Sequence, residues 1–118
     1  MILRTVEYSQ IARNKLKELR EYLRREYDEA ISRTILKEIT EKVRGLSRFP
    51  EKGVSISKLY DSMETDYYYL FINQNYIVYR FDDKQVIIIQ IFNEKEDFMK
   101  TLFGVSGRTQ ESIDYWGE

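Results

Sequence analysis

The chemistry open to this sequence is limited first by what it lacks. Its 118 residues include no cysteine and no histidine. That excludes a disulfide framework, a thiolate zinc site and a cysteine nucleophile, and it removes the most common general base and metal nitrogen. Recognition or catalysis must therefore rest on tyrosines, arginines, lysines, amides and carboxylates, and we expect neither a metal nor a cofactor.

Alternation along the predicted strands gathers aromatic and polar side chains on one face of a sheet. Because side chains alternate across a strand and Gln90 is a poor core residue, we expect Ile87, Ile89 and Ile91 to face the core. The same argument on the preceding strands completes an open face: Tyr67, Tyr69, Tyr76, Arg80 and Gln90. Such a face suits stacking on unpaired bases or docking of a peptide. Cross-strand packing of the tyrosines is the alternative.

Two helices must lie on the other side of that sheet. After a short alternating strand over 2–8, Ser9 can cap a helix whose apolar residues recur every three or four positions from Ala12 to Tyr27. Asp28 can cap a second helix, on which Ile31, Ile35, Ile39 and Val43 repeat every four residues. The short connection predicts an antiparallel helical hairpin that ends near Gly45 and Pro50.

The remainder predicts mainly strands. Segments 54–60, 67–72, 76–81 and 86–92 alternate or are rich in β-branched and aromatic residues. The short polar connections between the last three require antiparallel hairpins. Asn93 and Glu96 resemble a capping box for a short helix that Gly104 closes.

The predicted fold is α+β: an N-terminal strand and a two-helix antiparallel hairpin packed on a four-stranded, mainly antiparallel sheet, with a short C-terminal helix. We expect one domain over residues 1–104, followed by a tail over 105–118.

Charge is distributed unevenly along the chain. The net charge is −1, but residues 1–60 carry 14 basic and 9 acidic side chains, whereas residues 61–118 carry 5 and 11. The basic half could attract an anionic partner, or it could reflect ordinary solvated helix faces. No apolar run is long enough to cross a membrane, and the first residues form no signal-peptide core, so we expect a cytoplasmic protein without a membrane partner.

Several motifs in order resemble the RelE/ParE superfamily of bacterial type II toxins. The resemblance covers residues 2–103 and is carried by Tyr8-Ser9, by the segment 46–53 (LSRFPEKG), by Asn75-Tyr76-Ile77-Val78-Tyr79-Arg80, and by the strand 86–92 with the NEKEDF that follows it. It implies a growth-inhibiting toxin with the predicted fold, bound and neutralised by a cognate antitoxin.

The superfamily contains two activities. RelE-like members are ribosome-dependent endoribonucleases that cut mRNA, whereas ParE-like members inhibit DNA gyrase. In the nuclease branch, arginines match Tyr69 and Tyr76, and a histidine or tyrosine follows the last strand near residues 92–95. This chain lacks those groups. An inactive relative that only binds antitoxin is a third reading.

A nuclease of this sequence would need substitutes for the missing groups. RNA cleavage requires a base, cations that stabilise the phosphorane, and a donor to the leaving oxygen. The resemblance implies that the catalytic candidates are Lys58, Arg80, Tyr76, Glu94 and Lys95. The candidates for RNA binding are Arg48, Lys52, Tyr60, Tyr67, Tyr69 and Gln90.

The sequence alone ranks the nuclease, acting on the ribosome and mRNA, slightly ahead of gyrase inhibition because an aromatic face suits RNA. The acidic second half of the chain slightly disfavours the nuclease, since phosphate-binding surfaces are usually basic. For the antitoxin, we expect docking on the helix faces and along the last strand at the edge of the sheet, with an acidic partner drawn to the basic half.

Overall fold

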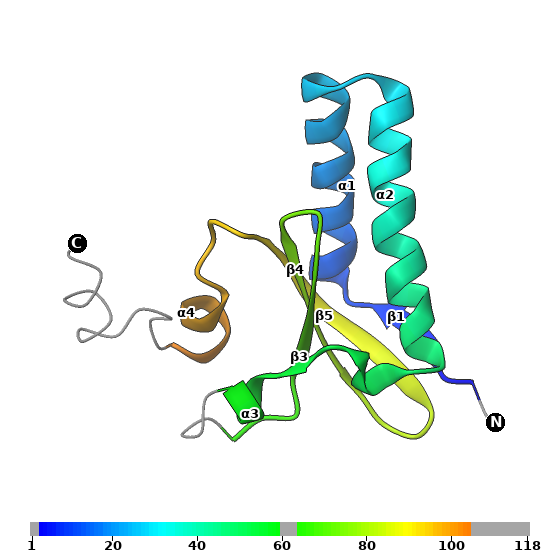
Figure 1. Cartoon of the computed structure of the whole chain (residues 1–118). Coiled ribbons are helices and arrows are strands. Elements are labelled where there is room, and N and C mark those ends of the chain that lie inside the picture. The colour runs from blue at the N-terminus through cyan, green and yellow to red at the C-terminus, as the bar shows by residue number, and fades with distance from the viewer. Residues whose placement is uncertain (1–2, 60–63, 105–118) are drawn as a thin grey trace.

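A sheet with helices on both faces organises the chain. The computed structural model describes residues 3–59 and 64–104, so Tyr60 and the tail over 105–118 lie outside it. The strands are β1 (Thr5–Tyr8), β2 (Val54–Ser55), β3 (Tyr68–Ile72), β4 (Asn75–Phe81) and β5 (Gln85–Asn93). Their order is β1-β5-β4-β3-β2, with β1 parallel to β5 and the other pairs antiparallel. The α+β class and the meander are confirmed, with five strands rather than four (Figure 1).

The strand order corrects one expectation. The last strand, β5, lies between β1 and β4, and the edges of the sheet are β1 and β2. The backbone groups of β5 are therefore paired on both sides, so a partner cannot add a strand there.

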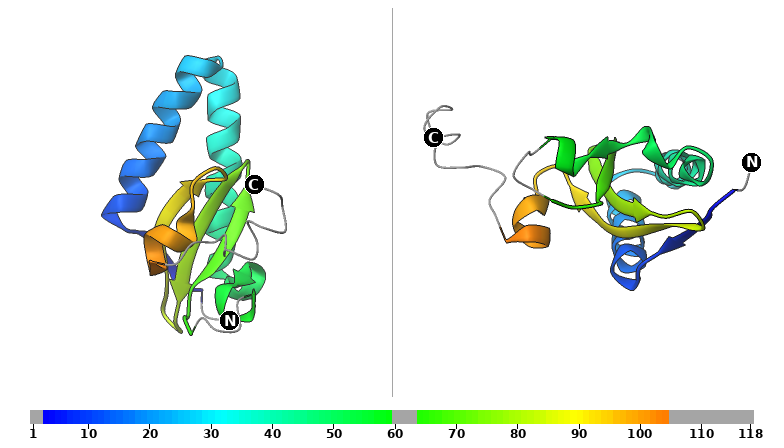
Figure 2. Two further views of the ribbon diagram at one scale, coloured as in Figure 1. Left: turned by 90° about the vertical axis from the view of Figure 1, so that its left-hand side faces the viewer. Right: turned by 90° about the horizontal axis from the view of Figure 1, so that it is seen from below.

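The helical hairpin forms as predicted. Helix α1 (Gln10–Glu26) begins after Ser9, whose side chain accepts a hydrogen bond from the Ala12 N–H, and α2 (Glu29–Arg44) begins after Asp28, which caps Ile31 in the same way. The end of the hairpin that joins the two helices extends past the sheet (Figures 1 and 2). The main core cluster therefore takes its fully buried hairpin residues, Ala12, Ile39 and Val43, from the part of the hairpin nearer β1.

Ser9 joins the hairpin to the middle of the sheet. Its hydroxyl accepts from the Ala12 N–H at 3.0 Å and donates to the Ile89 carbonyl at 2.5 Å. Its backbone N–H donates to the Ile88 carbonyl at 2.9 Å. One residue thus caps α1 and fixes the start of that helix against β5.

A β-bulge at Ile89 changes which residues of β5 face the hairpin. Gln90 pairs with Val78 of β4 and Ile88 pairs with Tyr79, so Ile89 has no partner in the register. The extra residue reverses the alternation. The main core beneath the hairpin therefore takes Val86, Ile88 and Ile91 from β5. The prediction was right for Ile91 and wrong for Ile87 and Ile89.

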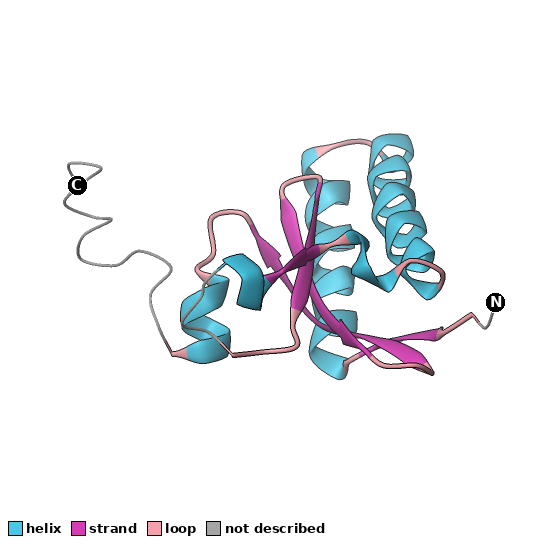
Figure 3. Cartoon of the chain, turned by 60° about the horizontal axis from the view of Figure 1, so that its bottom comes forward, coloured by secondary structure: helices cyan, strands magenta, loops and turns pink. Residues whose placement is uncertain are grey.

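A second core lies on the opposite face, under α3 (Ile56–Leu59) and α4 (Phe98–Phe103). Its buried residues are Ile56, Val78, Phe92 and Met99. Figure 3 shows α4 and the hairpin on opposite sides of the sheet. The sequence prediction had left this face open, and that was wrong. The signal was present, because Phe98, Met99 and Leu102 recur at helical spacing beside the strand.

Two local predictions on this side also change. The predicted strand over 54–60 is described as far as residue 59, and within that part only Val54–Ser55 forms a strand, because the Ser55 hydroxyl accepts from the Lys58 N–H at 3.4 Å and begins a helical turn. The predicted capping pair Asn93 and Glu96 instead closes a turn, with the Asn93 N–H bound to Glu96 at 2.9 Å. Asp97 caps α4, and Gly104 ends it at φ +72°, as expected for a C-terminal glycine.

The Tyr79 hydroxyl ties the segment after the hairpin to β4. Two short 3₁₀ turns, η1 (Gly45–Ser47) and η2 (Pro50–Lys52), lead from α2 to β2. The buried hydroxyl accepts from the Gly53 N–H at 3.0 Å and donates to the Pro50 carbonyl at 2.7 Å. Burial raises the pKa of Tyr79 to about 12 despite the opposing Gly53 bond, which keeps the hydroxyl protonated as a donor.

We predict that Ser9→Ala lowers the free energy of unfolding by about 2–3 kcal/mol, because it removes both a cap and a partner of the Ile89 carbonyl. The matched variant Asp28→Ala removes only a cap and should cost about 1 kcal/mol. Urea denaturation of both variants measures the difference. Equal losses would show that the bond to Ile89 adds nothing.

Two glycine substitutions should have opposite signs. A Cβ at Gly53 would contact the Tyr79 hydroxyl and lie 2.6 Å from the Tyr69 carbonyl oxygen, whereas a Cβ at Gly45 meets nothing within 4 Å. Gly53→Ala should therefore destabilise by about 1–3 kcal/mol, and Gly45→Ala should stabilise by about 0.5–1 kcal/mol. Thermal denaturation checks both, and a Gly53→Ala variant as stable as wild type would contradict the close approach.

Candidate functional site

The tyrosines expected on an open face are packed beneath α4. Tyr69 and Tyr76 meet edge to face with ring centroids 5.4 Å apart, and Phe98 of α4 lies 4.9 Å from the Tyr76 ring and 5.7 Å from the Tyr69 ring. Tyr67 stacks at 5.7 Å on Phe103. All three tyrosines are half-buried. Phe98 therefore occupies part of the surface of Tyr69 and Tyr76 on which a base would stack.

Three of the predicted catalytic residues lie together at one end of the β4–β5 pair. Tyr76 pairs in register with Phe92, near the end of β5. Glu94 and Lys95 follow that strand in an exposed turn, where the Glu94 N–H donates to the Gln74 carbonyl at 2.8 Å. A carboxylate, an ammonium and a phenol therefore share this end of the sheet.

The other two predicted catalytic residues lie toward the opposite end. Arg80 is four residues further along β4, about 13 Å from Tyr76 at the rise of a strand, and it lines a hollow of about 150 Å³ together with Asp66 and Asp82. Exposed Lys58 belongs to α3, which the bond from the Ile56 N–H to the Tyr67 carbonyl holds at this same end. The five candidates thus form two groups.

The candidates for RNA binding are also dispersed. Exposed Arg48 and Lys52 flank the 3₁₀ turns after the hairpin. Gln90 is half-buried opposite Val78 on the face that α4 covers. Tyr60 lies outside the described residues. The structure therefore gathers neither predicted set around a single point.

A trough that the sequence analysis missed runs along the helical hairpin. Near β1 it is a hollow of about 300 Å³ whose apolar lining comes from Val6, Tyr8, Leu16 and Val43, with Thr40 and Arg44 beside them. Burial raises the pKa of Tyr8, against the lowering effect of the Arg44 charge. This end of the trough therefore presents an apolar surface with one neutral phenol and one cation.

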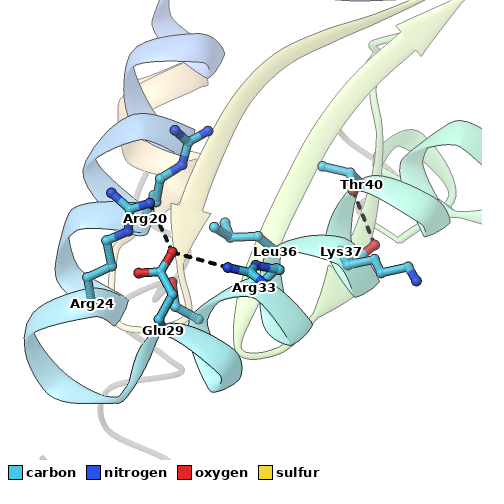
Figure 4. Close-up of a pocket in the computed structure, with 8 residues that line it drawn as sticks. Arg20, Arg24, Glu29, Arg33, Leu36, Lys37 and Thr40 are labelled. Atoms are coloured by element: carbon cyan, nitrogen blue, oxygen red, sulfur yellow. Dashed lines mark hydrogen bonds and ion pairs between the residues drawn. The ribbon is translucent and has the colours of Figure 1, made fainter.

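Toward the tip of the hairpin the trough becomes cationic. A second hollow of about 380 Å³ meets the first at Thr40 and is lined by Arg20, Arg24, Glu29, Ser32, Arg33, Leu36, Lys37 and Thr40. Figure 4 shows the carboxylate of Glu29 between the arginines. It pairs with Arg24 at 3.2 Å and Arg33 at 3.6 Å. The hollow is thus lined by one carboxylate, Glu29, and by four cations, so its rim carries net positive charge; these cations are Arg20, Arg24, Arg33 and Lys37.

The signal for the trough was in the helix spacing. Leu16, Arg20 and Arg24 recur every four residues on α1, as do Ser32, Leu36 and Thr40 on α2. The sequence showed that each helix has such a line of residues. It did not show that the two lines face each other.

Neither a metal site nor a membrane span is found in the part of the chain that the structure describes. No group of three or more acidic side chains over 3–59 and 64–104 could hold a metal ion. Among the same residues, no helix is long and apolar enough to cross a membrane.

Comparison with known proteins identifies the family. Residues 6–98 match the family model described as "ParE toxin of type II toxin-antitoxin system, parDE". A solved structure titled "Chromosomal ParDE TA system from P. aeruginosa" has the same fold, with a TM-score of 0.64 and 14% identity, covering 79% of this chain and 98% of that chain. No match was found among curated protein sequences. Since the family model spans most of the described fold, this chain belongs to the ParE toxins of type II toxin–antitoxin systems.

Proposed function

We propose that the protein arrests bacterial growth by binding its target, without cutting RNA, and that it does so in the cytoplasm. ParE membership makes it a toxin and implies a cognate antitoxin, which we propose neutralises it by direct binding. The target we propose is DNA gyrase, the enzyme that ParE-like members inhibit.

The separation of the candidate catalytic residues is the observation that carries this proposal. Proton transfer and charge stabilisation during RNA cleavage must occur around one phosphate, within hydrogen-bond reach of each group. Tyr76 and Arg80 are four residues apart on one strand, about 13 Å. Phe98 also packs on the Tyr76 ring. Part of the Tyr76 ring is therefore already in contact with α4 and is not available to an RNA substrate.

The charges around Arg80 favour the same conclusion. Asp66 and Asp82 share its hollow, and hydrogen bonds from the N–H groups of Lys84 and Gln85 lower the pKa of the Asp82 carboxyl, which keeps it ionised. Carboxylates beside the single arginine of this strand repel phosphate. Inhibition by binding requires no such site.

We predict that the purified toxin, freed of antitoxin, inhibits DNA supercoiling by gyrase at concentrations comparable to the enzyme. Occupancy of a target inhibits stoichiometrically, whereas a nuclease would leave this reaction untouched. A supercoiling assay measures the effect, with relaxation by topoisomerase I as the control. Restored supercoiling on addition of antitoxin is also expected. Normal supercoiling with excess toxin would overturn the choice of gyrase.

The double variant Lys58→Ala/Arg80→Ala separates binding from cleavage in cells. Both side chains are exposed and outside the two cores, so the variant should fold. We expect it to stop growth on induction as wild type does. Loss of growth arrest in a variant with an unchanged circular dichroism spectrum would instead support the nuclease.

A further inference from the structure

We infer that the toxin contacts DNA gyrase through the turns that follow the hairpin. The Phe49 ring enters an apolar pocket of the enzyme, and Arg48 and Lys52 bind acidic side chains around that pocket. This inference rests on the proposed inhibition of gyrase, and it adds the surface of the toxin and the chemistry of the site that receives it. We call Leu3, Arg48, Phe49 and Lys52 the loop surface.

The exposure of Phe49 indicates a binding partner. Its side chain is 59% exposed, the highest fraction for a large apolar residue within 3–59 and 64–104. Leu3, 55% exposed, belongs to a segment held against the same turns. The Arg4 N–H donates to the Ser47 carbonyl at 3.1 Å, and the Ser47 hydroxyl donates to the Arg4 carbonyl at 2.6 Å. Protein interfaces are enriched in aromatic residues and depleted of most charged ones at their centres.

The charges around Phe49 specify an anionic partner. Arg48 precedes the ring directly, and the bond from the Lys52 N–H to the Phe49 carbonyl at 3.2 Å closes a 3₁₀ turn. Such a turn brings the fourth residue to the same side as the first. Arg48, Glu51 and Lys52 are exposed and form no ion pair within residues 3–59 and 64–104. Two cations and one carboxylate leave positive charge that an acidic partner complements.

The mixture of residue types favours the gyrase protein over the DNA that it holds. The carboxylate of Glu51 lies between the two cations in the sequence, where it repels phosphate. Phe49 and Leu3 also lack apolar counterparts on a phosphate backbone, whose contacts are mainly polar and ionic. An exposed aromatic ring beside an arginine is typical of the residues that contribute most to protein–protein binding.

The fold fixes the position of the loop surface before any partner binds. The buried Tyr79 hydroxyl is bound to the Pro50 carbonyl at 2.7 Å and to the Gly53 N–H at 3.0 Å, so both ends of η2 are tied to β4. Gly53 also approaches β3 so closely that a Cβ there would lie 2.6 Å from the Tyr69 carbonyl oxygen. The segment lies at the end of the hairpin away from its tip (Figure 1). A surface held in this way loses little conformational entropy on binding.

Three variants test the loop surface. Phe49→Ala removes the ring, and Arg48→Glu/Lys52→Glu reverses both cations. The control Arg13→Glu/Lys17→Glu makes the same change of net charge at two exposed positions on α1 that form no ion pair in the described chain and line none of the three hollows described above. Each purified toxin, freed of antitoxin, is titrated into the gyrase supercoiling assay. Circular dichroism and thermal denaturation verify that each variant is folded.

We expect Phe49→Ala and Arg48→Glu/Lys52→Glu each to raise the toxin concentration for half-inhibition at least about tenfold. The control should stay within about threefold of wild type. All three variants are expected to melt within a few degrees of wild type, because the substituted side chains are exposed. Weaker inhibition by a folded variant then reports a lost contact with gyrase.

Three results would overturn the inference in distinguishable ways. Wild-type inhibition by both loop variants would place the gyrase contact elsewhere and leave the proposed function standing. Full inhibition by Phe49→Ala, together with loss of binding to a labelled 20-base-pair DNA duplex by Arg48→Glu/Lys52→Glu, would make the loop surface a phosphate-binding one. A wild-type toxin that leaves supercoiling unchanged would contradict both this inference and the proposed choice of gyrase.

Discussion

The bond from the Ser9 hydroxyl to the Ile89 carbonyl is the contact on which the rest of this structure depends. The same hydroxyl caps α1 through the Ala12 N–H, so it fixes the start of the hairpin to the bulged residue inside β5, which has no register partner on β4. The bulge at that point turns Ile88 and Ile91 toward the hairpin. The core beneath the two helices, and hence their position over the sheet, follows from it.

Sequence patterns predicted the local elements well because those elements depend on neighbouring residues. The caps Ser9 and Asp28, the helical stripes and the close of α4 at Gly104 were all visible in the sequence. The bulge was not, because alternation assumes an uninterrupted period of two, and Ile89 is as apolar as its neighbours. The order of the strands could not be predicted from local patterns either, because the parallel partner of β5 is β1, which lies at the other end of the chain.

For the site, residue type proved a weaker guide than position. Tyr69 and Tyr76 could serve in stacking or in packing, and only the placement of α4 shows that their rings pack against Phe98. The trough depends in the same way on how two helices face each other. Its cations looked like an ordinary solvated helix surface in the sequence, and the structure places Arg20 and Lys37 in the lining of one hollow together with Leu36. A toxin that acts by binding its target, as proposed above, needs no histidine.

The most direct test of inhibition by binding is to sequence RNA 5′ ends after brief induction of the toxin in a bacterium that lacks the antitoxin, with and without a block on translation. We predict that growth stops while no new 5′ ends appear inside translated codons. New ends within codons that vanish when translation is blocked would contradict this account. They would show that the toxin cuts mRNA on the ribosome.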